Sequence, residues 1–290
     1  MLGLIGAALT ATPSLAKLAS RSLPSETINL VTATGRVSQV TRWSAKRSRG
    51  TILFSHGARS SPLHYDALIL PWVAAGYDVW APMHVDSPAH PDTRQFPGFA
   101  PWRARIEDMR ALSTQLGNRP RIAAGHSYGA LVALTLGGAS AEVPEGLTGP
   151  LNDPLVSAVV AFSPPPPIKG LVSREGYATL GVPTLIETGT RDVLPGAPPG
   201  LDAWRGHLAA YDVAASGQDR YAMVLDGVNH FFGGMICWPD EPGPPQRAQM
   251  AIAVDISRLF LDGYALGAPR ARTALDARLG VHGALNLSRK

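Results

Sequence analysis

Short apolar runs alternate with longer segments of helical spacing along most of this 290-residue chain. Short apolar runs between turn residues are typical of buried strands, whereas apolar residues that recur every third or fourth position are typical of amphipathic helices. The predicted strands span residues 26–33, 36–43, 50–57, 77–82, 121–124, 154–163, 183–189 and 220–227. The predicted helices span residues 64–77, 101–117, 201–212 and 245–265, and one more begins at Ser127.

This alternation predicts an α/β fold with a mostly parallel central sheet of about eight strands and helices on both faces. The first two strands are expected to form a hairpin around Gly35. The chain shows no internal repeat, so residues 25–266 are interpreted as one domain. Residues 267–290 are rich in arginine and weakly patterned, and we expect them to form a C-terminal tail.

Residues 1–24 begin with an apolar stretch and are interpreted as a signal peptide or a flexible N-terminal extension. Small residues at Ser14 and Ala16 favour a cleavage site, but no positive charge precedes the apolar stretch. Export and a cytoplasmic location therefore both stay open. No segment is apolar for long enough to predict a membrane span, so we expect no stable membrane insertion.

Composition narrows the class of protein. Hydrophobic residues make up 45% and charged residues 17%, which predicts a substantial buried core. The net charge is +4, but the basic residues are scattered, and no aromatic residues accompany the single cluster at 42–49, so no nucleic-acid partner is predicted. Cys237 is the single cysteine, which excludes an intrachain disulfide and a multi-cysteine zinc site. We interpret it as a small apolar residue.

The segment 121–134 carries the strongest chemical signal. It reads RIAAGHSYGALVAL, a predicted strand followed by Gly-His-Ser-Tyr-Gly and a predicted helix. Glycines two positions before and after Ser127 are typical of a sharp turn that presents a nucleophilic serine and leaves no room for side chains beside it. We therefore predict that Ser127 is a nucleophile.

A serine hydroxyl is a weak nucleophile at neutral pH and needs a general base within hydrogen-bond distance. His230 follows the predicted strand 220–227, and Asp192 follows the predicted strand 183–189. Ser127 also follows a predicted strand, so we expect all three side chains at the same edge of the sheet. We predict His230 as the base and Asp192 as the acid that orients it, with Glu187 as the alternative acid.

A loop after the strand 50–57 is the candidate for stabilising negative charge on the substrate. Its sequence is FSHGARS, and backbone N–H groups there can act together with the N–H of the residue that follows the nucleophile. The predicted donors of this oxyanion hole are Ala58 and Tyr128.

Four segments carry a resemblance to the α/β-hydrolase superfamily: FSHGARSSPLHYDALILPWVAAGYDVWAP, GHSYGA, GTRDVLP and GVNHFFGG. The resemblance to this superfamily covers roughly residues 26–265. Within the superfamily, the chain is most similar to two branches: serine esterases like the bacterial platelet-activating-factor acetylhydrolases, and relatives of dienelactone hydrolase. The resemblance implies a Ser127–Asp192–His230 triad, an Ala58/Tyr128 oxyanion hole and no cofactor or metal. Dienelactone hydrolases use cysteine where Ser127 stands here, so the expected reaction is the hydrolysis of small to medium, fairly apolar carboxylic esters.

Candidates for the substrate pocket surround these positions. An apolar cluster follows His230, and it is expected either to line an acyl or alcohol pocket or to pack in the core under a loop. Two loops after strands, 86–101 and 163–181, are further candidates because ligands bind beyond the carboxyl ends of parallel strands. The remaining candidates are Phe231, Phe232, Met235, Ile236 and Trp238 in the cluster, with Arg59, His64 and the Tyr128 ring nearby.

Other functions remain as alternatives. The same triad could act on a lactone, a thioester or a polyester. Four residues of one loop, His84, Asp86, His90 and Asp92, have a spacing that could hold a divalent ion for a metal-assisted hydrolase. A non-catalytic binding protein of the same fold is the third class. The sequence leaves the oligomeric state open.

Overall fold

The computed structural model of the protein describes residues 25–196, 200 and 202–290. Its strands are β1 (Ser25–Val31), β2 (Val37–Trp43), β3 (Gly50–Ser55), β4 (Tyr77–Pro82), β5 (Arg121–His126), β6 (Val156–Phe162), β7 (Thr184–Arg191), β8 (Arg220–Asn229), β9 (Gly280–His282) and β10 (Leu285–Arg289). Its helices are α1 (Asp66–Ala74), α2 (Pro101–Leu116), α3 (Tyr128–Leu136), α4 (Arg174–Ala178), α5 (Ala209–Asp212), α6 (Arg247–Phe260) and α7 (Pro269–Asp276). Single turns form η1 (Pro62–Tyr65), η2 (Thr93–Gln95), η3 (Ala203–Leu208) and the π-helical η4 (Leu261–Ala265).

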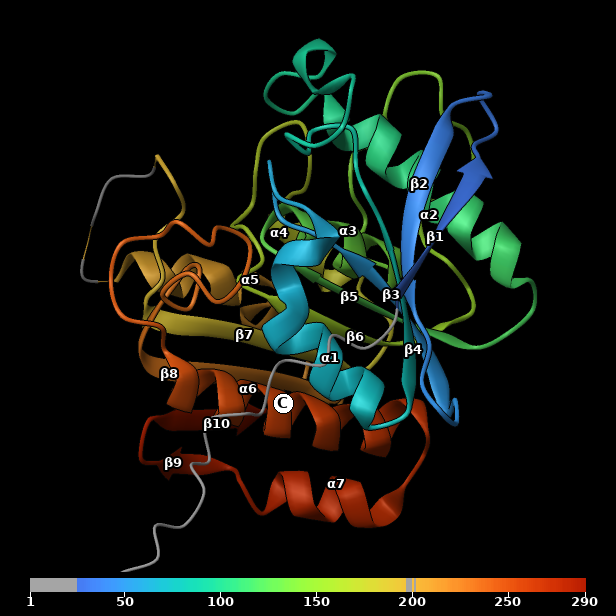
Figure 1. The fold of residues 1–290 in the computed structure, drawn as a ribbon. Coiled ribbons are helices and arrows are strands. Elements are labelled where there is room, and N and C mark those ends of the chain that lie inside the picture. The colour runs from blue at the N-terminus through green and yellow to red at the C-terminus, as the bar shows by residue number, and fades with distance from the viewer. Residues whose placement is uncertain (1–24, 197–199, 201) are drawn as a thin grey trace, which may run out of the picture.

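The strands of the described residues form one ten-stranded sheet in the order β1-β2-β4-β3-β5-β6-β7-β8-β10-β9 (Figure 1). Neighbouring strands from β4 to β8 are parallel, while β1, β2, β9 and β10 pair antiparallel at the two edges. The predicted α/β architecture with a mostly parallel sheet is confirmed, with two strands more than the eight predicted.

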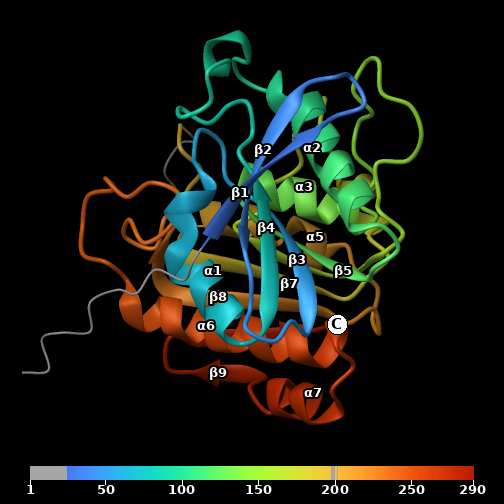
Figure 2. The same ribbon diagram turned by 45° about the vertical axis from the view of Figure 1, so that its right-hand side comes forward.

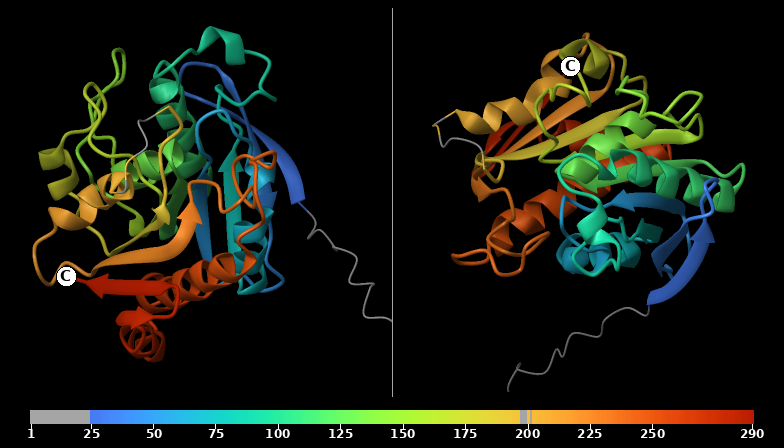
Figure 3. Two further views of the ribbon diagram at one scale, coloured as in Figure 1. Left: turned by 90° about the vertical axis from the view of Figure 1, so that its left-hand side faces the viewer. Right: turned by 90° about the horizontal axis from the view of Figure 1, so that it is seen from above.

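Helices cover both faces of the sheet, so the central strands are buried on both sides. In β3, Ile52 and Phe54 face the layer of α1 and α6, whereas Leu53 faces the layer of α2 and α3. The further views in Figure 3 separate the helices into these two layers. Trp72 of α1 donates its ring N–H to the Ser257 hydroxyl of α6 at 3.0 Å, which joins the two helices of one layer. No helix of the described residues is long and apolar enough to cross a membrane.

The prediction of a C-terminal tail over residues 267–290 is wrong. These residues form α7, β9 and β10; Figure 2 shows α7 and β9 below α6, and β10 extends the main sheet by pairing with β8 (Figure 1). Leu285 and Leu287 are buried, and Asn286 between them is exposed. This alternation of buried and exposed residues is too short, in an arginine-rich segment, to predict a strand. In place of the helix predicted at 201–212, the structure has the turn η3 and the short helix α5. The prediction for residues 1–24 lies outside the described residues.

The turn between β5 and α3 lies against β3 with no space for side chains at its two glycines. A Cβ atom added to Gly129 would lie 1.9 Å from the Ser55 carbonyl oxygen, and one added to Gly125 would lie 2.2 Å from the Gly129 carbonyl oxygen. Both contacts are with backbone atoms, which cannot move without shifting a central strand or the helix. Glycine is therefore required at both positions by sterics.

We expect Gly129→Ala to lower the free energy of unfolding by about 3 kcal/mol or more, because the added methyl group overlaps the backbone of β3. Gly181→Ala is the matched control, since its nearest neighbour would lie at 4.0 Å, and it should change stability by less than about 0.5 kcal/mol. Urea unfolding of both variants measures the difference. Equal losses in the two variants would contradict this account of the turn.

Candidate active site

Ser127 lies in the turn between β5 and α3 in a strained backbone conformation. Its φ is 54° and its ψ is −121°, a region that residues other than glycine rarely adopt. Its backbone N–H donates to the Phe162 carbonyl at the end of β6 at 2.8 Å, which holds the turn in place. Such strain persists where the surrounding structure imposes it and is common at active sites.

The three predicted triad residues are joined in a line of hydrogen bonds. Ser127 Oγ lies 2.9 Å from His230 Nε2, and His230 Nδ1 lies 2.7 Å from Asp192 Oδ1. His230 follows β8 and Asp192 follows β7, so the parallel sheet brings both side chains to the edge where Ser127 lies. The distances are those of direct hydrogen bonds throughout.

Asp192 is fully buried and held as a carboxylate. Its Oδ2 atom accepts hydrogen bonds from the Ser163 hydroxyl at 2.5 Å and the Thr188 hydroxyl at 3.0 Å. Burial alone would raise the pKa of Asp192, but His230 and a second histidine, His207, outweigh it and hold the pKa well below the ordinary range. Asp192 is therefore available as a carboxylate to accept a hydrogen bond from an imidazole N–H.

Glu187, the alternative acid, lies inside β7 and is fully buried. Burial raises the pKa of Glu187 well above its ordinary value, and within the described residues neither carboxyl oxygen has a hydrogen-bond partner. A neutral carboxyl group inside a strand does not orient His230. The geometry favours Asp192 for that position.

Backbone groups of the loop after β3 are fixed by Arg105 and Asp86. Arg105 donates to the His56 carbonyl at 2.7 Å and to the Gly57 carbonyl at 3.2 Å, while Asp86 accepts the Arg59 N–H at 3.0 Å. The ring of His56 lies 2.7 Å from the same Gly57 carbonyl. Three consecutive peptide groups of this loop are thus held by side chains.

This fixation sets the direction of the Ala58 N–H. The peptide bond is planar and trans, so the N–H of Ala58 points opposite to the Gly57 carbonyl and away from Arg105. Tyr128 is the first residue of α3, and its N–H has no acceptor within the helix. Ala58, Ser127 and Tyr128 line the same cavity, which is the arrangement expected of an oxyanion hole.

Arg105 is a residue beside the site that the sequence pattern did not single out. Its guanidinium is fully buried, pairs with Asp86 through contacts of 2.8 and 3.0 Å, and lies 4.6 Å from the centre of the Tyr128 ring. Arg105 therefore contacts the loop of Ala58 and the side chain of Tyr128, the two residues whose N–H groups are the predicted donors. An arginine on the buried face of the amphipathic helix α2 was the available signal.

A second chain of hydrogen bonds connects the same loop to the segment that carries His230. The Gly57 N–H donates to the Tyr65 hydroxyl at 2.8 Å, which lies 3.0 Å from His126 Nδ1, and His126 Nε2 lies 2.9 Å from the His230 carbonyl. Because a carbonyl only accepts, His126 Nε2 carries the proton and Tyr65 donates to Nδ1. Burial holds the pKa of His126 well below its ordinary value, so this ring is neutral.

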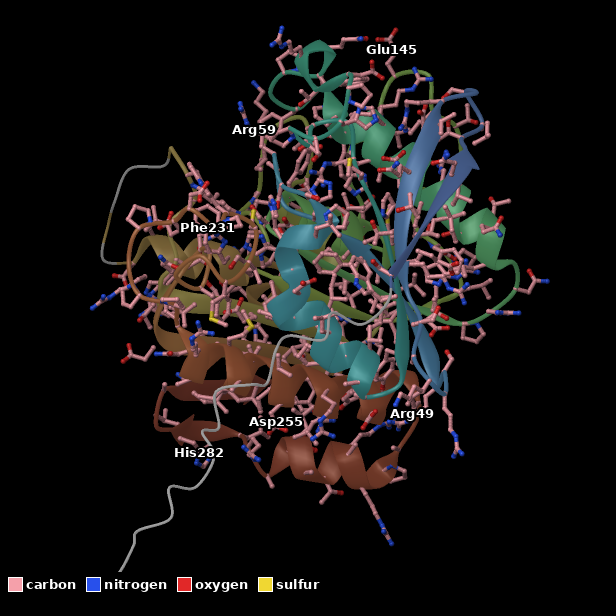
Figure 4. All side chains as sticks on the ribbon, in the orientation of Figure 1. Arg49, Arg59, Glu145, Phe231, Asp255 and His282 are labelled. Carbon is pink, nitrogen blue, oxygen red and sulfur yellow. The ribbon has the colours of Figure 1, made fainter. Side chains whose placement is uncertain are left out.

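A cavity of about 640 Å³ opens at Ser127. Both candidate loops contribute to it, the first through Pro88 and Phe99 and the second through Pro165 and Ile168. Most of the lining is apolar, and the polar residues Arg59, His64 and Asp240 also contact the cavity. Figure 4 shows Arg59 and Phe231 on the same side of the molecule, above α6 in that view. The other lining residues are Ala58, Gly98, Ser127, Tyr128, Leu194, Pro195, His230, Phe231, Cys237, Trp238 and Pro239.

The cluster after His230 divides between the cavity and the core. Phe231 and Trp238 line the cavity. The pocket prediction is wrong for Phe232, Met235 and Ile236. Phe232 and Ile236 are buried in the core on the side of α6, and the half-buried Met235 packs against that core. The segment 230–237 is a series of tight turns, with Phe232 at a φ of 53°, so neighbouring side chains point in different directions. A linear pattern does not reveal that division.

The four residues considered for a metal site bind protein partners instead. His84 lies 2.8 Å from both the Ser55 hydroxyl and Asp108, and Asp86 is paired with Arg105. The buried His90 accepts the Asp92 backbone N–H at its Nδ1 atom, and the Asp92 side chain is half exposed. Within the part of the chain that the structure describes, the group with converging ligand atoms is Asp192, His207 and His230, all buried at the candidate triad.

The family model described as "Alpha/beta hydrolase family" matches residues 52–279. The chain belongs to the alpha/beta hydrolase family. Its match spans the strands that carry Ser127, Asp192 and His230. The search of curated proteins found no match.

Solved structures of two esterases and a dienelactone hydrolase share the fold at low sequence identity. The esterase domain of a Rhodothermus marinus protein is 14% identical with a TM-score of 0.55, covering 83% of this chain and 99% of its own. A dienelactone hydrolase of Anabaena variabilis is 14% identical with a TM-score of 0.58, covering 83% and 98%. An esterase of Pyrococcus furiosus is 16% identical with a TM-score of 0.55, covering 84% and 91%.

We expect Asp86→Asn to lower the free energy of unfolding at pH 7 by about 3–5 kcal/mol, because it leaves the Arg105 charge buried without its partner. Burial alone would raise the pKa of Asp86, but Arg105 outweighs it and lowers the pKa. The stabilisation by this carboxylate is therefore present above the ordinary carboxyl pKa and is lost as the pH falls below about 4.

Urea unfolding at pH 7 and at a series of lower pH values tests this expectation. The wild type should lose stability more steeply than Asp86→Asn as the pH falls. Asp92→Asn, on the same loop with a side chain that is 46% exposed, is the control and should stay within about 0.5 kcal/mol of the wild type. Identical pH slopes in wild type and Asp86→Asn would refute the assignment.

Proposed function

We propose that this alpha/beta hydrolase is a carboxylic-ester hydrolase in which Ser127 is the nucleophile, His230 the general base and acid, and Asp192 the residue that orients His230. The observation that carries the proposal is the line of hydrogen bonds from Ser127 through His230 to Asp192, which ends at an apolar cavity. A serine beside a buried imidazole and carboxylate is the arrangement that activates a hydroxyl for acyl transfer.

The reaction follows from this geometry in two halves. Ser127 Oγ attacks the ester carbonyl as His230 Nε2 takes its proton, and the resulting oxyanion accepts hydrogen bonds from the N–H groups of Ala58 and Tyr128. The C–O bond to the alcohol then breaks, and His230 returns the proton to the leaving oxygen. Water, deprotonated by His230, attacks the acyl-enzyme, and the acid leaves as Ser127 regains its proton.

Small to medium, fairly apolar esters are the proposed substrates. The cavity is large enough for a ligand of moderate size, and ligand pockets of this kind gain affinity mainly from apolar walls. Phe99, Ile168, Leu194, Phe231 and Trp238 offer such walls for an acyl or alcohol group. The reaction as derived requires no cofactor and no partner other than the small-molecule ester.

Ser127→Ala should reduce kcat/KM for a p-nitrophenyl ester by about 10⁴-fold or more, because the acyl-enzyme can no longer form. A fluorophosphonate probe should label the wild type at one site per chain and leave Ser127→Ala unlabelled. Ser157→Ala, near the start of β6, is the control and should keep both properties. Turnover that survives in Ser127→Ala would rule out this site and favour a different one.

Chain length provides a separate test of the pocket. Over a series of p-nitrophenyl esters from acetate to palmitate, kcat/KM should rise up to a medium chain length, by at most about fourfold per methylene, and then fall. Trp238→Ala should flatten the rise because it removes an apolar wall, whereas Val281→Ala on β9 should leave the profile unchanged. A maximum at palmitate, or the same profile in Trp238→Ala, would contradict the proposed substrate class.

A further inference from the structure

A second histidine contacts the carboxylate of the candidate triad. His207 lies in η3 and is 2% exposed. Its Nε2 atom is 3.1 Å from Asp192 Oδ1, the same oxygen that lies 2.7 Å from His230 Nδ1. Its Nδ1 atom is 2.8 Å from the Pro164 carbonyl oxygen. Asp192 is thus shared between two imidazole rings whose centres are 5.8 Å apart.

Both neighbours of the His207 ring accept hydrogen bonds and neither can donate one. A carbonyl oxygen only accepts, and an ionised carboxylate only accepts. A neutral imidazole carries one N–H, so one of the two contacts would then bring two lone pairs together. An imidazolium carries two N–H groups and satisfies both contacts.

The other titratable groups around this ring do not compete for the positive charge. His126, from β5, is kept neutral because burial lowers its pKa, and Glu187, from β7, is kept neutral because burial raises its pKa. Burial alone would lower the pKa of His207 as well, but its contacts with Asp192 and Pro164 outweigh burial and raise it. Asp192, after β7, and His230, after β8, are the remaining ionisable groups beside it.

We propose that His207 is a positioning residue, held as an imidazolium, that balances the charge of Asp192 and thereby keeps His230 available as a base at lower pH. This inference rests on the proposed function, because it concerns how His230 acts in the same site. A positive charge beside Asp192 disfavours a second positive charge on His230. The catalytic imidazole therefore stays unprotonated further into the acid range than it would beside an unbalanced carboxylate.

The size of the effect follows from the separation of the rings. For unit charges at the 5.8 Å between ring centres, an effective dielectric constant of about 20 gives an interaction equivalent to about two pH units. Removing the charge should move the acid limb of the kcat/KM profile toward higher pH by about one to two units. A purely structural role for His207 would lower the plateau and leave the limb in place.

His207→Gln tests this directly, because glutamine keeps a donor for Asp192 and has no charge. We expect its acid limb to move upward by about one to two pH units while the plateau stays within about tenfold of the wild type. Thr188→Val is the matched control, since it removes a neutral hydrogen bond to the same carboxylate, and its limb should move by less than about half a unit. An unmoved limb in His207→Gln would overturn the proposal.

Nitrogen NMR of histidine-labelled protein gives a readout that does not depend on activity or on the folding of His207→Gln. Both ring nitrogens of His207 should carry protons at pH 7 in the wild type, with assignments taken from His207→Asn and from coupling to neighbouring residues. One bare nitrogen at pH 7 would overturn the proposal. If the wild type hydrolyses no ester, the proposed function fails, and this spectrum still decides the charge of His207.

Discussion

The close approach of the β5–α3 turn to β3 is the constraint on which the rest of the site depends. The backbone at Gly125 and Gly129 is in contact with the backbone of neighbouring segments, so the turn can be neither wider nor shifted. Ser127 is held at a positive φ at its tip, within hydrogen-bond distance of His230. Because strands pair in parallel on both sides of β5, the loops that follow them meet at this turn.

Buried polar groups hold the loops around this turn in place. Charges are costly to bury, so the Arg105–Asp86 pair is stable only because nearly every donor and acceptor around it is used. Its hydrogen bonds end on the loop of Ala58, and its aromatic contact is with Tyr128. A chain through Tyr65 and His126 ties the same loop to the His230 segment. The predicted donors and the predicted base are thereby held by one connected network.

The sequence was informative where local pattern and chemistry coincide. Glycine spacing around Ser127, and polar residues directly after apolar strands at Asp192 and His230, predicted positions that the sheet does bring together. The pattern failed where the decisive contact is distant in sequence. Arg105 lies on the apolar face of its predicted helix with no partner visible in the sequence, and Asp86 was considered for a metal site, because their pairing exists only in the folded chain.

The chain by itself determined the main strands and helices up to residue 265, the glycine-flanked turn at Ser127 and the residues that follow the strand ends, because these depend on local periodicity and on glycine. Tertiary structure decided which of the apolar residues after His230 face the cavity, since tight turns direct Phe231 and Phe232 to different sides. It also decided that residues 267–290 complete the sheet and that His207 meets Asp192. Such contacts join residues far apart in the sequence, and only the packing of the whole sheet brings them within hydrogen-bond distance.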